Sequence, residues 1–350
     1  YRNAGYVVGT YTSPHLLHYN ERVRIAKQQV SDAELCASFE KIEQARTLQK
    51  LESGFHPQGV GRSCKTVEAV TTTHHRNDGV TDIPLTYFEF GTLAAMQCFI
   101  EHKVDVAILE VGLGGRLDAV NVFDNDCAIV TSVDIDHVDY LGDTREKIAF
   151  EKAGIFRKDR VAICADDNVP QAIRDHAKDV GAELWCIGSE FGFEMGETEL
   201  PIPLSRPHGH PLPVPARGIP AASSSKAART GETGEGKGGG QWNCRSPVGS
   251  RNALPIPALR GAFQLNNASA VLAALDALKE KLPVSMAAVR RGLTEVQLAG
   301  RFQFVPGKPQ LILDVAHNPH AARSLADNLG GLPECPNTYA VFAMLKDKDM

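Results

Sequence analysis

Short apolar runs and amphipathic stretches alternate along this chain. The apolar runs are rich in β-branched residues, which is typical of buried strands, and they cover residues 6–12, 104–111, 127–133, 161–165 and 183–188. Helical spacing of apolar residues between them predicts helices from Ser31 to about Arg46, over 86–101, up to Gly154 and after Pro170. This alternation predicts an α/β fold, in which a mainly parallel sheet is flanked by helices.

Capping signals sharpen three of the predicted helix starts. Ser31 with Glu34 makes a capping box. We expect Asp143 and Glu146 to cap the helix that ends at Gly154, and Pro170 to occupy the first position of the next helix.

Two segments interrupt the pattern, and a second domain follows them. Residues 46–82 are dominated by Gly, Thr, His and Pro, and residues 196–253 by Pro, Gly, Ser and Arg. Because neither segment has apolar periodicity, we expect irregular insertions. The spacing of Val271, Leu272, Leu275 and Leu278 predicts an amphipathic helix, and a second helix is predicted near 284–293. From about Gly300, strand QLILDVA, a helix over 320–329 and strand TYAVFAML predict a βαβ unit. We therefore expect a domain over 1–298 and a smaller, truncated Rossmann-like α/β domain over 299–350.

Composition and charge narrow the function classes. The 350 residues are 43% hydrophobic, carry a formal net charge of −5 and include eight singly scattered cysteines. This small charge argues against partners bound by bulk electrostatics, so we expect neither nucleic acid nor a membrane. Scattered cysteines are typical of reduced thiols, and no apolar run reaches 18 residues, so we expect a cytoplasmic protein.

Polar residues follow two of the predicted strands directly. Glu110 ends the first, and Asp134, Asp136 and His137 end the second. Because ligands of open α/β sheets bind outside the carboxyl ends of the strands, this edge predicts a metal and phosphate site. Taken alone, Glu110 is as compatible with a structural strand-end carboxylate, and an isolated histidine is more often structural.

Two glycine-rich segments resemble phosphate-binding loops without matching them. Residues 231–238 nearly fit G-x-x-x-x-G-K-[ST], but Gly238 replaces the hydroxyl residue, and no strand precedes the segment. The VGLGG segment at 111–115 lacks the third glycine of G-x-G-x-x-G, where Leu117 stands.

Eight segments occur in an order that resembles a known family. They are SPHL with NERVRI, LTYFEFGTLAA, LEVGLGGRLDAVN, DIDHVDYLGDT, EKAGI, LRGAFQLNNASA, GRFQ and LDVAHNPHAA. The series resembles the dihydrofolate synthase/folylpolyglutamate synthase family of the Mur ligase superfamily, in its bifunctional bacterial form. It covers the chain apart from about 46–82 and 196–253.

The resemblance implies roles for particular residues. It implies magnesium ligands at Ser13, Glu110 and His137, a carboxylated lysine at Lys152 that helps to hold a second Mg²⁺, and a supporting catalytic role for His317. It further implies ATP contacts at Asn267, Arg301 and Asp314. The implied pteroate-binding residues are Thr86, Tyr87, Phe88, Glu89, Leu117, Asp118 and Ala119. From sequence context alone, Lys152 is typical of a solvated helix lysine and Arg301 of an ordinary surface arginine.

The resemblance also implies an activity, which is ATP-dependent ligation of L-glutamate to dihydropteroate or to folates through an acyl phosphate. We expect a monomer whose partners are these small molecules. The family's glycine-rich phosphate loop is expected upstream of Tyr1, so we expect the chain as printed to be inactive without it. The alternatives are a cell-wall amino-acid ligase of the Mur type, a non-catalytic folate-binding fragment, and a nucleotide kinase that forms no amide.

Overall fold

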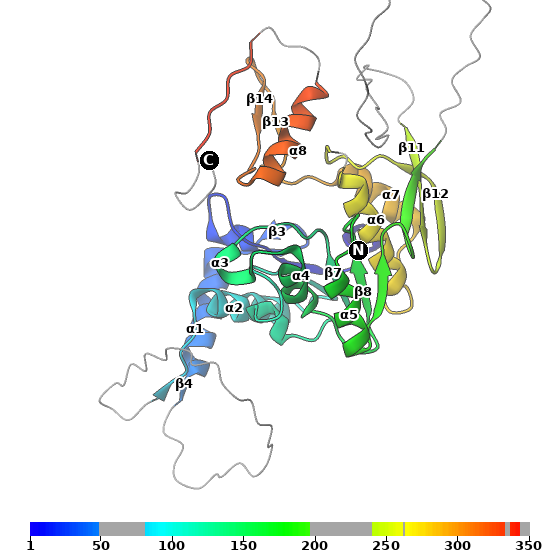
Figure 1. The fold of residues 1–350 in the computed structure, drawn as a ribbon. Helices are drawn as coiled ribbons and strands as arrows, with labels where there is room; N and C mark the ends of the chain where they lie inside the picture. The colour runs from blue at the N-terminus through cyan, green and yellow to red at the C-terminus, as the bar shows by residue number, and fades with distance from the viewer. Residues whose placement is uncertain (49–80, 197–239, 262, 333–336, 344–350) are drawn as a thin grey trace, which may run out of the picture. The chain divides into compact units, whose positions relative to one another are not determined.

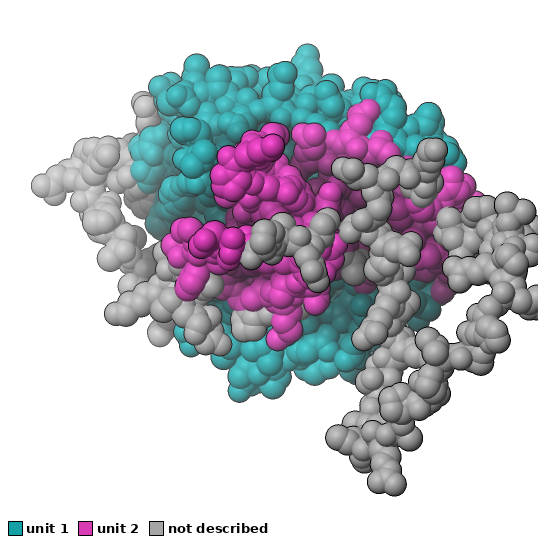
Figure 2. Space-filling view, turned by 90° about the horizontal axis from the view of Figure 1, so that it is seen from above, with its two compact units in different colours: residues 1–191, 270–292 teal, residues 192–269, 293–350 magenta. Residues whose placement is uncertain are grey.

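The computed structural model describes residues 1–48, 81–196, 240–261, 263–332 and 337–343 (Figure 1). These residues form two compact units, coloured separately in Figure 2. The first unit comprises Tyr1–Phe191 with Ala270–Gly292, and the second comprises Gly192–Ser269 with Leu293–Met350. The division falls within two helices, α6 (Phe263–Ala277) and α7 (Met286–Glu295).

One sheet of the first unit has the strand order β3-β2-β1-β6. Strands β1 (Val8–Tyr11) and β6 (Val106–Leu109) run parallel, whereas β2 (Val23–Ile25) and β3 (Gln28–Gln29) add antiparallel pairs. Helices α1 (Asp32–Arg46) and α2 (Tyr87–Glu101) pack against each other. Tyr11, Leu35 and Phe99 belong to one buried cluster, which therefore joins this sheet to both helices. Short elements complete this part of the unit: η1 (Arg2–Ala4), η2 (Tyr19–Arg22), β4 (Thr47–Leu48), β5 (Thr81–Asp82) and η3 (Ala119–Val122).

The second sheet of this unit is fully parallel, with the order β7-β8-β9. It consists of β7 (Cys127–Val130), β8 (Val161–Cys164) and β9 (Glu183–Cys186). Successive residues of a strand face opposite sides of a sheet. Accordingly Ala162 and Cys164 pack in a core with α4 (Arg145–Ala153) and α5 (Gln171–Val180), whereas Ile163 packs with Ala270 and Ala273 of α6. Helices thus cover both faces.

The second unit contains an antiparallel sheet that the sequence analysis did not predict. Strands β10 (Gly192–Met195), β11 (Gln241–Ser246) and β12 (Gly249–Pro255) pair in that order. The prediction of an irregular segment over 196–253 is therefore wrong for residues 241–253. Trp242 and Cys244 point inward at strand spacing, and both are buried together with Leu254, so burial of this apolar face stabilises the hairpin.

The remaining elements complete the chain. Strands β13 (Gln303–Val305) and β14 (Leu311–Leu313) form an antiparallel pair, followed by α8 (Pro319–Gly330). Helix α7 (Met286–Glu295) precedes them. The predicted strand TYAVFAML is not formed over the described residues 337–343, where the side chains of Tyr339, Val341 and Phe342 are largely exposed. An exposed segment without a neighbouring strand cannot satisfy its backbone in a sheet.

The predicted α/β class with parallel strands and flanking helices is confirmed, although the parallel pairs belong to two separately bonded sheets. The Ser31–Glu34 capping box is also confirmed. The predicted caps of α4 are wrong, because Thr144 is the N-cap and Asp143 pairs with Lys147. Glu146 instead accepts backbone N–H groups at the start of α5. Pro170 lies one position earlier than predicted, as the N-cap of α5. The near-match at 231–238 lies outside the described residues, and the domain division at 298/299 stays a prediction.

Candidate functional site

Two of the predicted metal ligands meet where β1 and β6 end. The parallel register pairs Tyr11 with Leu109 and continues one step further, because the Glu110 backbone N–H donates to the Tyr11 carbonyl oxygen at 2.9 Å. The Ser13 backbone N–H then donates to Oε2 of Glu110, also at 2.9 Å. Glu110 is exposed and Ser13 is half-buried. The carboxylate and the hydroxyl residue therefore lie side by side at the carboxyl edge of the sheet, where ligands of such sheets bind.

His137 occupies a constrained turn after β7. Its backbone is left-handed, with φ 51° and ψ 45°, and it is the N-cap of α3 (Val138–Leu141). The Asp136 carboxylate accepts its backbone N–H at 2.8 Å and lies 4.0 Å from its Nε2. The exposed imidazole can accept a ligand, because neither contact covers the ring. Its approach to Glu110 and Ser13 stays a prediction.

Lys152 lies on α4 and is only half-exposed. Burial lowers the pKa of its amine, and the Asp136 carboxylate partly opposes this shift. A lowered pKa increases the fraction of neutral, nucleophilic amine at neutral pH.

The predicted ligand set is suited to magnesium by its chemistry. No three His, Cys, Asp or Glu side chains gather as a metal cluster in the part of the chain that the structure describes. The predicted set has only two such residues, Glu110 and His137, and a hydroxyl at Ser13. Mg²⁺ keeps several waters and commonly takes one or two protein carboxylates plus substrate phosphates, so a sparse set of this kind fits it.

The predicted pteroate-binding segment 86–89 forms the start of α2. Thr86 and Glu89 are both used locally, because each accepts the backbone N–H of the other in a capping box. Tyr87 is 66% exposed, although its ring lies edge-on to the Tyr19 ring, with 5.9 Å between the ring centres. The Phe88 ring packs 5.8 Å from the ring of Tyr11. The exposed tyrosine is therefore the member of this segment best placed to touch a substrate.

The second predicted pteroate segment, 117–119, lies in a loop built on Asp118. Its carboxylate accepts the backbone N–H groups of Gly112 and Leu113 at 2.9 Å and that of Val120 at 3.0 Å. These bonds fold the glycine-rich loop that follows Glu110. Leu117 is 75% exposed at the loop surface, and Ala119 begins η3. Asp118 thus shapes this surface.

An ion pair that the sequence analysis missed joins this loop to α4. Arg116 donates from Nη2 to Glu151 at 2.9 Å, and its backbone N–H donates to the Glu151 carbonyl oxygen at 2.8 Å. The guanidinium also lies 5.7 Å from the centre of the Phe150 ring. The residue next to Lys152 is therefore fixed to the loop that carries Leu117 and Asp118. The partners are 35 positions apart, so spacing gave no signal.

The predicted ATP-contacting residues lie in the second unit. Asp314 accepts the backbone N–H groups of Phe302 and Ala316, both at 2.8 Å, and so holds the turn that carries Arg301. His317 is exposed, and its Nδ1 lies 2.9 Å from the Val315 carbonyl oxygen. On α6, Asn267 donates to the Gln264 side chain at 3.3 Å. Asp314, Arg301 and His317 thus share one local structure, and their meeting with the first unit stays a prediction.

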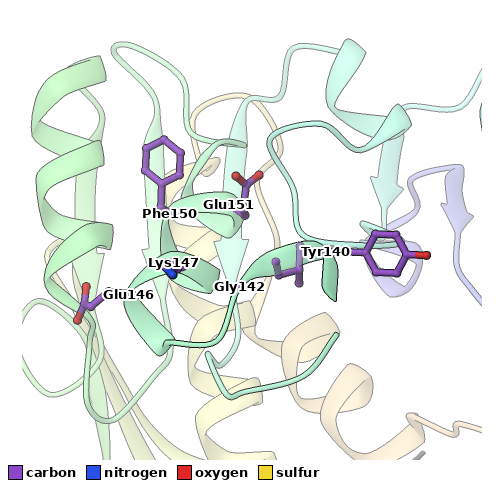
Figure 3. Close-up of a pocket in the computed structure, with 7 residues that line it drawn as sticks. Tyr140, Gly142, Glu146, Lys147, Phe150 and Glu151 are labelled. Atoms are coloured by element: carbon purple, nitrogen blue, oxygen red, sulfur yellow. The ribbon is translucent and has the colours of Figure 1, made fainter. Parts of the chain in front are cut away.

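A shallow pocket of about 470 Å³ lies beside α3 and α4 (Figure 3). Its lining includes Tyr140, Lys147, Phe150 and Glu151. His137 and Lys152, the neighbours of these residues in sequence, are not part of the lining, so the pocket adjoins the predicted site without coinciding with it.

Two family models match parts of the chain. The Mur ligase middle domain matches residues 62–198, and the Mur ligase glutamate ligase domain matches residues 300–350.

None of the described helices is both long and apolar enough to cross a membrane.

Comparisons with individual proteins agree. The dihydrofolate synthase/folylpolyglutamate synthase of Escherichia coli K12 is 37% identical over 347 residues, which are 99% of this chain and 63% of that protein. The enzyme of the same name from Bacillus subtilis is 30% identical, with 99% and 66% covered. This chain thus spans less than two thirds of either relative.

Solved structures show the same likeness. Escherichia coli FolC with ADP superimposes with a TM-score of 0.68 at 36% identity, over 95% of this chain and 61% of that one. A bifunctional folylpolyglutamate synthase/dihydrofolate synthase with Mn, AMPPNP and L-glutamate gives 0.65 at 37% identity, over 94% and 60%. The chain belongs to the dihydrofolate synthase/folylpolyglutamate synthase family of Mur ligases.

Proposed function

We propose that the protein to which this chain belongs ligates L-glutamate to dihydropteroate, to the γ-carboxylate of folates, or to both, at the expense of ATP. The γ-phosphoryl group passes to a substrate carboxylate oxygen and ADP leaves. The glutamate amine then attacks the acyl carbon, phosphate leaves, and the amine loses a proton. The observation that carries the proposal is the pairing of Glu110 with Ser13 at the carboxyl edge of parallel strands. It occurs in a chain whose relatives are named dihydrofolate synthase/folylpolyglutamate synthase.

The site residues divide the work between charge and orientation. Glu110, His137 and the Ser13 hydroxyl would hold Mg²⁺, which when bound neutralises phosphate charge during transfer. A related structure contains Mn and AMPPNP, which supports a divalent metal with ATP. Asn267, Arg301 and Asp314 would contact ATP, with His317 in support. Arg301 supplies a cation that Asp314 positions through the Phe302 backbone.

Lys152 is suited to become a carbamate. The neutral amine attacks CO₂, a C–N bond forms, and one proton leaves, so a cation becomes an anion able to hold a second Mg²⁺. Only the unprotonated amine reacts, and burial of Lys152 favours that form. Its partial shielding from water also protects the product.

The pteroate would lie against the surface formed by residues 86–89 and 117–119. Tyr87 and Leu117 expose apolar area there, while the Thr86–Glu89 cap and the Asp118 bonds fix the backbone beneath them. A related structure holds DHPP together with ADP, which supports this substrate class. We further propose that the protein is a cytoplasmic monomer.

Glutamate-dependent ADP release by the protein to which this chain belongs, its phosphate loop included, tests the proposal with dihydropteroate as acceptor. We expect release to require all three components and Mg²⁺, and we expect Glu110→Gln to abolish it. Release with a UDP-muramoyl acceptor instead would identify a cell-wall ligase. Phosphate release without glutamate would identify a kinase. Calorimetric binding of dihydropteroate without any turnover would identify a non-catalytic binding fragment.

A further inference from the structure

The carboxyl ends of β7 and β8 are joined by an ion pair between a half-buried arginine and a buried carboxylate, which lies outside the predicted site. Asp166, which follows β8, has a side chain only 8% exposed, and Arg145 opens α4. Arg145 Nη2 donates to Asp166 Oδ1 at 2.9 Å. A buried carboxylate of this kind is retained at a desolvation penalty, so its partners indicate what it holds.

The other groups that this pair contacts all belong to the backbone that follows the two strands. Asp166 accepts the Val133 N–H at 2.7 Å on Oδ2 and the Asn168 N–H at 2.9 Å on Oδ1. Arg145 donates through Nε to the Val133 carbonyl oxygen at 2.9 Å and through Nη2 to the Asn168 carbonyl oxygen at 3.0 Å. Both polar groups of the Val133 peptide backbone are therefore held by this one pair.

Val133 is the last buried residue before the turn that carries His137. It is 3% exposed, whereas Asp134, Ile135 and His137 are exposed. Within the turn, Asp134 and Asp136 each accept the backbone N–H of the next residue along the chain, at 2.8 Å. The direction in which the turn leaves the sheet is thus set at Val133.

The same pair also orients the helix that carries Lys152. Arg145 and Lys152 are seven positions apart, which places them on one face of α4. The neighbouring Glu146 accepts the backbone N–H groups of Gln171 and Ala172 at the start of α5. Helix α4 is therefore tied at its first turn to two strand ends and to a second helix.

We propose that Asp166 and Arg145 are positioning residues that set the His137 turn and the first turn of α4 for metal binding. This role rests on the metal site proposed above. Neither residue touches the metal or a substrate. Their contribution is to fix a ligand that would otherwise stand on an exposed turn, as partners behind metal ligands do in other proteins.

A titration of the chain with Mn²⁺, in which the EPR signal of the free ion reports how much metal is bound, tests the positioning role without depending on turnover. Asp166→Asn keeps the shape but leaves one oxygen to serve three donors, so the Val133 N–H or the guanidinium loses its acceptor. We expect the Kd for Mn²⁺ to rise about tenfold. Arg145→Lys keeps the charge and loses the planar fork, so we expect a smaller rise; it also provides a measurement if Asp166→Asn does not fold.

A matched control separates positioning from general loss of stability. Ile173 is fully buried in the core cluster that also contains Val133, and Ile173→Val removes one methylene from it. We expect it to lower the Tm without changing the Kd for Mn²⁺. If Asp166→Asn and Arg145→Lys leave the Kd unchanged, or if Ile173→Val weakens binding as much as they do, the positioning role is overturned. If His137→Ala and Glu110→Gln also leave it unchanged, or if the unmodified chain does not bind Mn²⁺, the proposed metal site itself fails.

Discussion

Substitution of Gly115 tests how closely the glycine-rich loop must approach α4. A methyl group on Gly115 would lie 2.9 Å from the Glu151 carbonyl oxygen and 3.0 Å from that of Lys152. Both are helix backbone atoms, which cannot rotate away. The Ile155 side chain is also 3.0 Å away. Gly115→Ala would therefore push the loop off the last turn of α4.

The expected magnitude combines two opposing effects. Overpacking a buried position costs about 1–3 kcal/mol. The loss of backbone freedom in the unfolded chain returns about 0.4–1 kcal/mol. We expect Gly115→Ala to lower the free energy of unfolding by about 1–2 kcal/mol, which corresponds to a fall in Tm of roughly 2–8 °C.

Gly292 provides the matched control within the same unit. It lies inside α7, and a methyl group there would meet no atom within 4 Å among the described residues. We expect Gly292→Ala to stabilise by about 0.5–1 kcal/mol, because alanine favours the helix. Both variants are measured by thermal and denaturant unfolding followed by circular dichroism. A Gly115→Ala protein as stable as Gly292→Ala would refute the close-packing argument.

Three further predictions address other parts of the molecule. Trp242→Ala should lower the free energy of unfolding by about 3–5 kcal/mol, because Trp242 is fully buried and its Nε1 donates to the Pro255 carbonyl oxygen. Denaturant unfolding measures this, and a loss below about 1 kcal/mol would contradict the burial of Trp242 in the β11–β12 hairpin. Hydrogen bonds from the backbone N–H groups of His18, Leu16 and Leu17 lower the pKa of the Glu21 carboxyl from 4.5 to about 2, so these bonds should be complete above pH 4.5 and be lost as the pH falls toward 2. NMR titration of the three amides checks this, and Glu21→Gln should remove the pH dependence of their chemical shifts. In ¹³C-bicarbonate, the ¹³C NMR signal of the Lys152 carbamate should fall as the pH is lowered, because protonation removes the reactive neutral amine. The signal should vanish in Lys152→Met and persist in Lys147→Met, and a signal that survives Lys152→Met would contradict the assignment.

Continuous apolar runs made the parallel strands predictable. The segment 161–165 is apolar throughout, since β8 is covered on both faces, and such a run has few alternative structures. The Ser31 capping box is a local signal and was equally readable. The hairpin β11–β12 was missed because its Gly, Ser, Pro and Arg content obscured the alternation of Trp242 and Cys244.

The candidate site was predictable only in part, for a related physical reason. Strand ends marked Glu110 and His137, because polar residues that follow buried strands lie at a ligand-binding edge. The pairs Arg145–Asp166 and Arg116–Glu151 join residues 21 and 35 positions apart. Contacts of that range depend on the assembled fold, which no local pattern reports.

The continuation of the β1–β6 ladder into Glu110 and Ser13 makes chain length in this region a functional constraint. The backbone bond to Tyr11 and the side-chain bond to Ser13 follow each other without a spare residue. Adding or deleting one residue in β6 would turn the Glu110 carboxylate to the opposite side of the sheet, and the same change in β1 would move Ser13 out of register with it. In a library of single-codon insertions and deletions selected for growth, we therefore expect residues 8–13 and 106–110 to be nearly empty of survivors, even where point changes are tolerated.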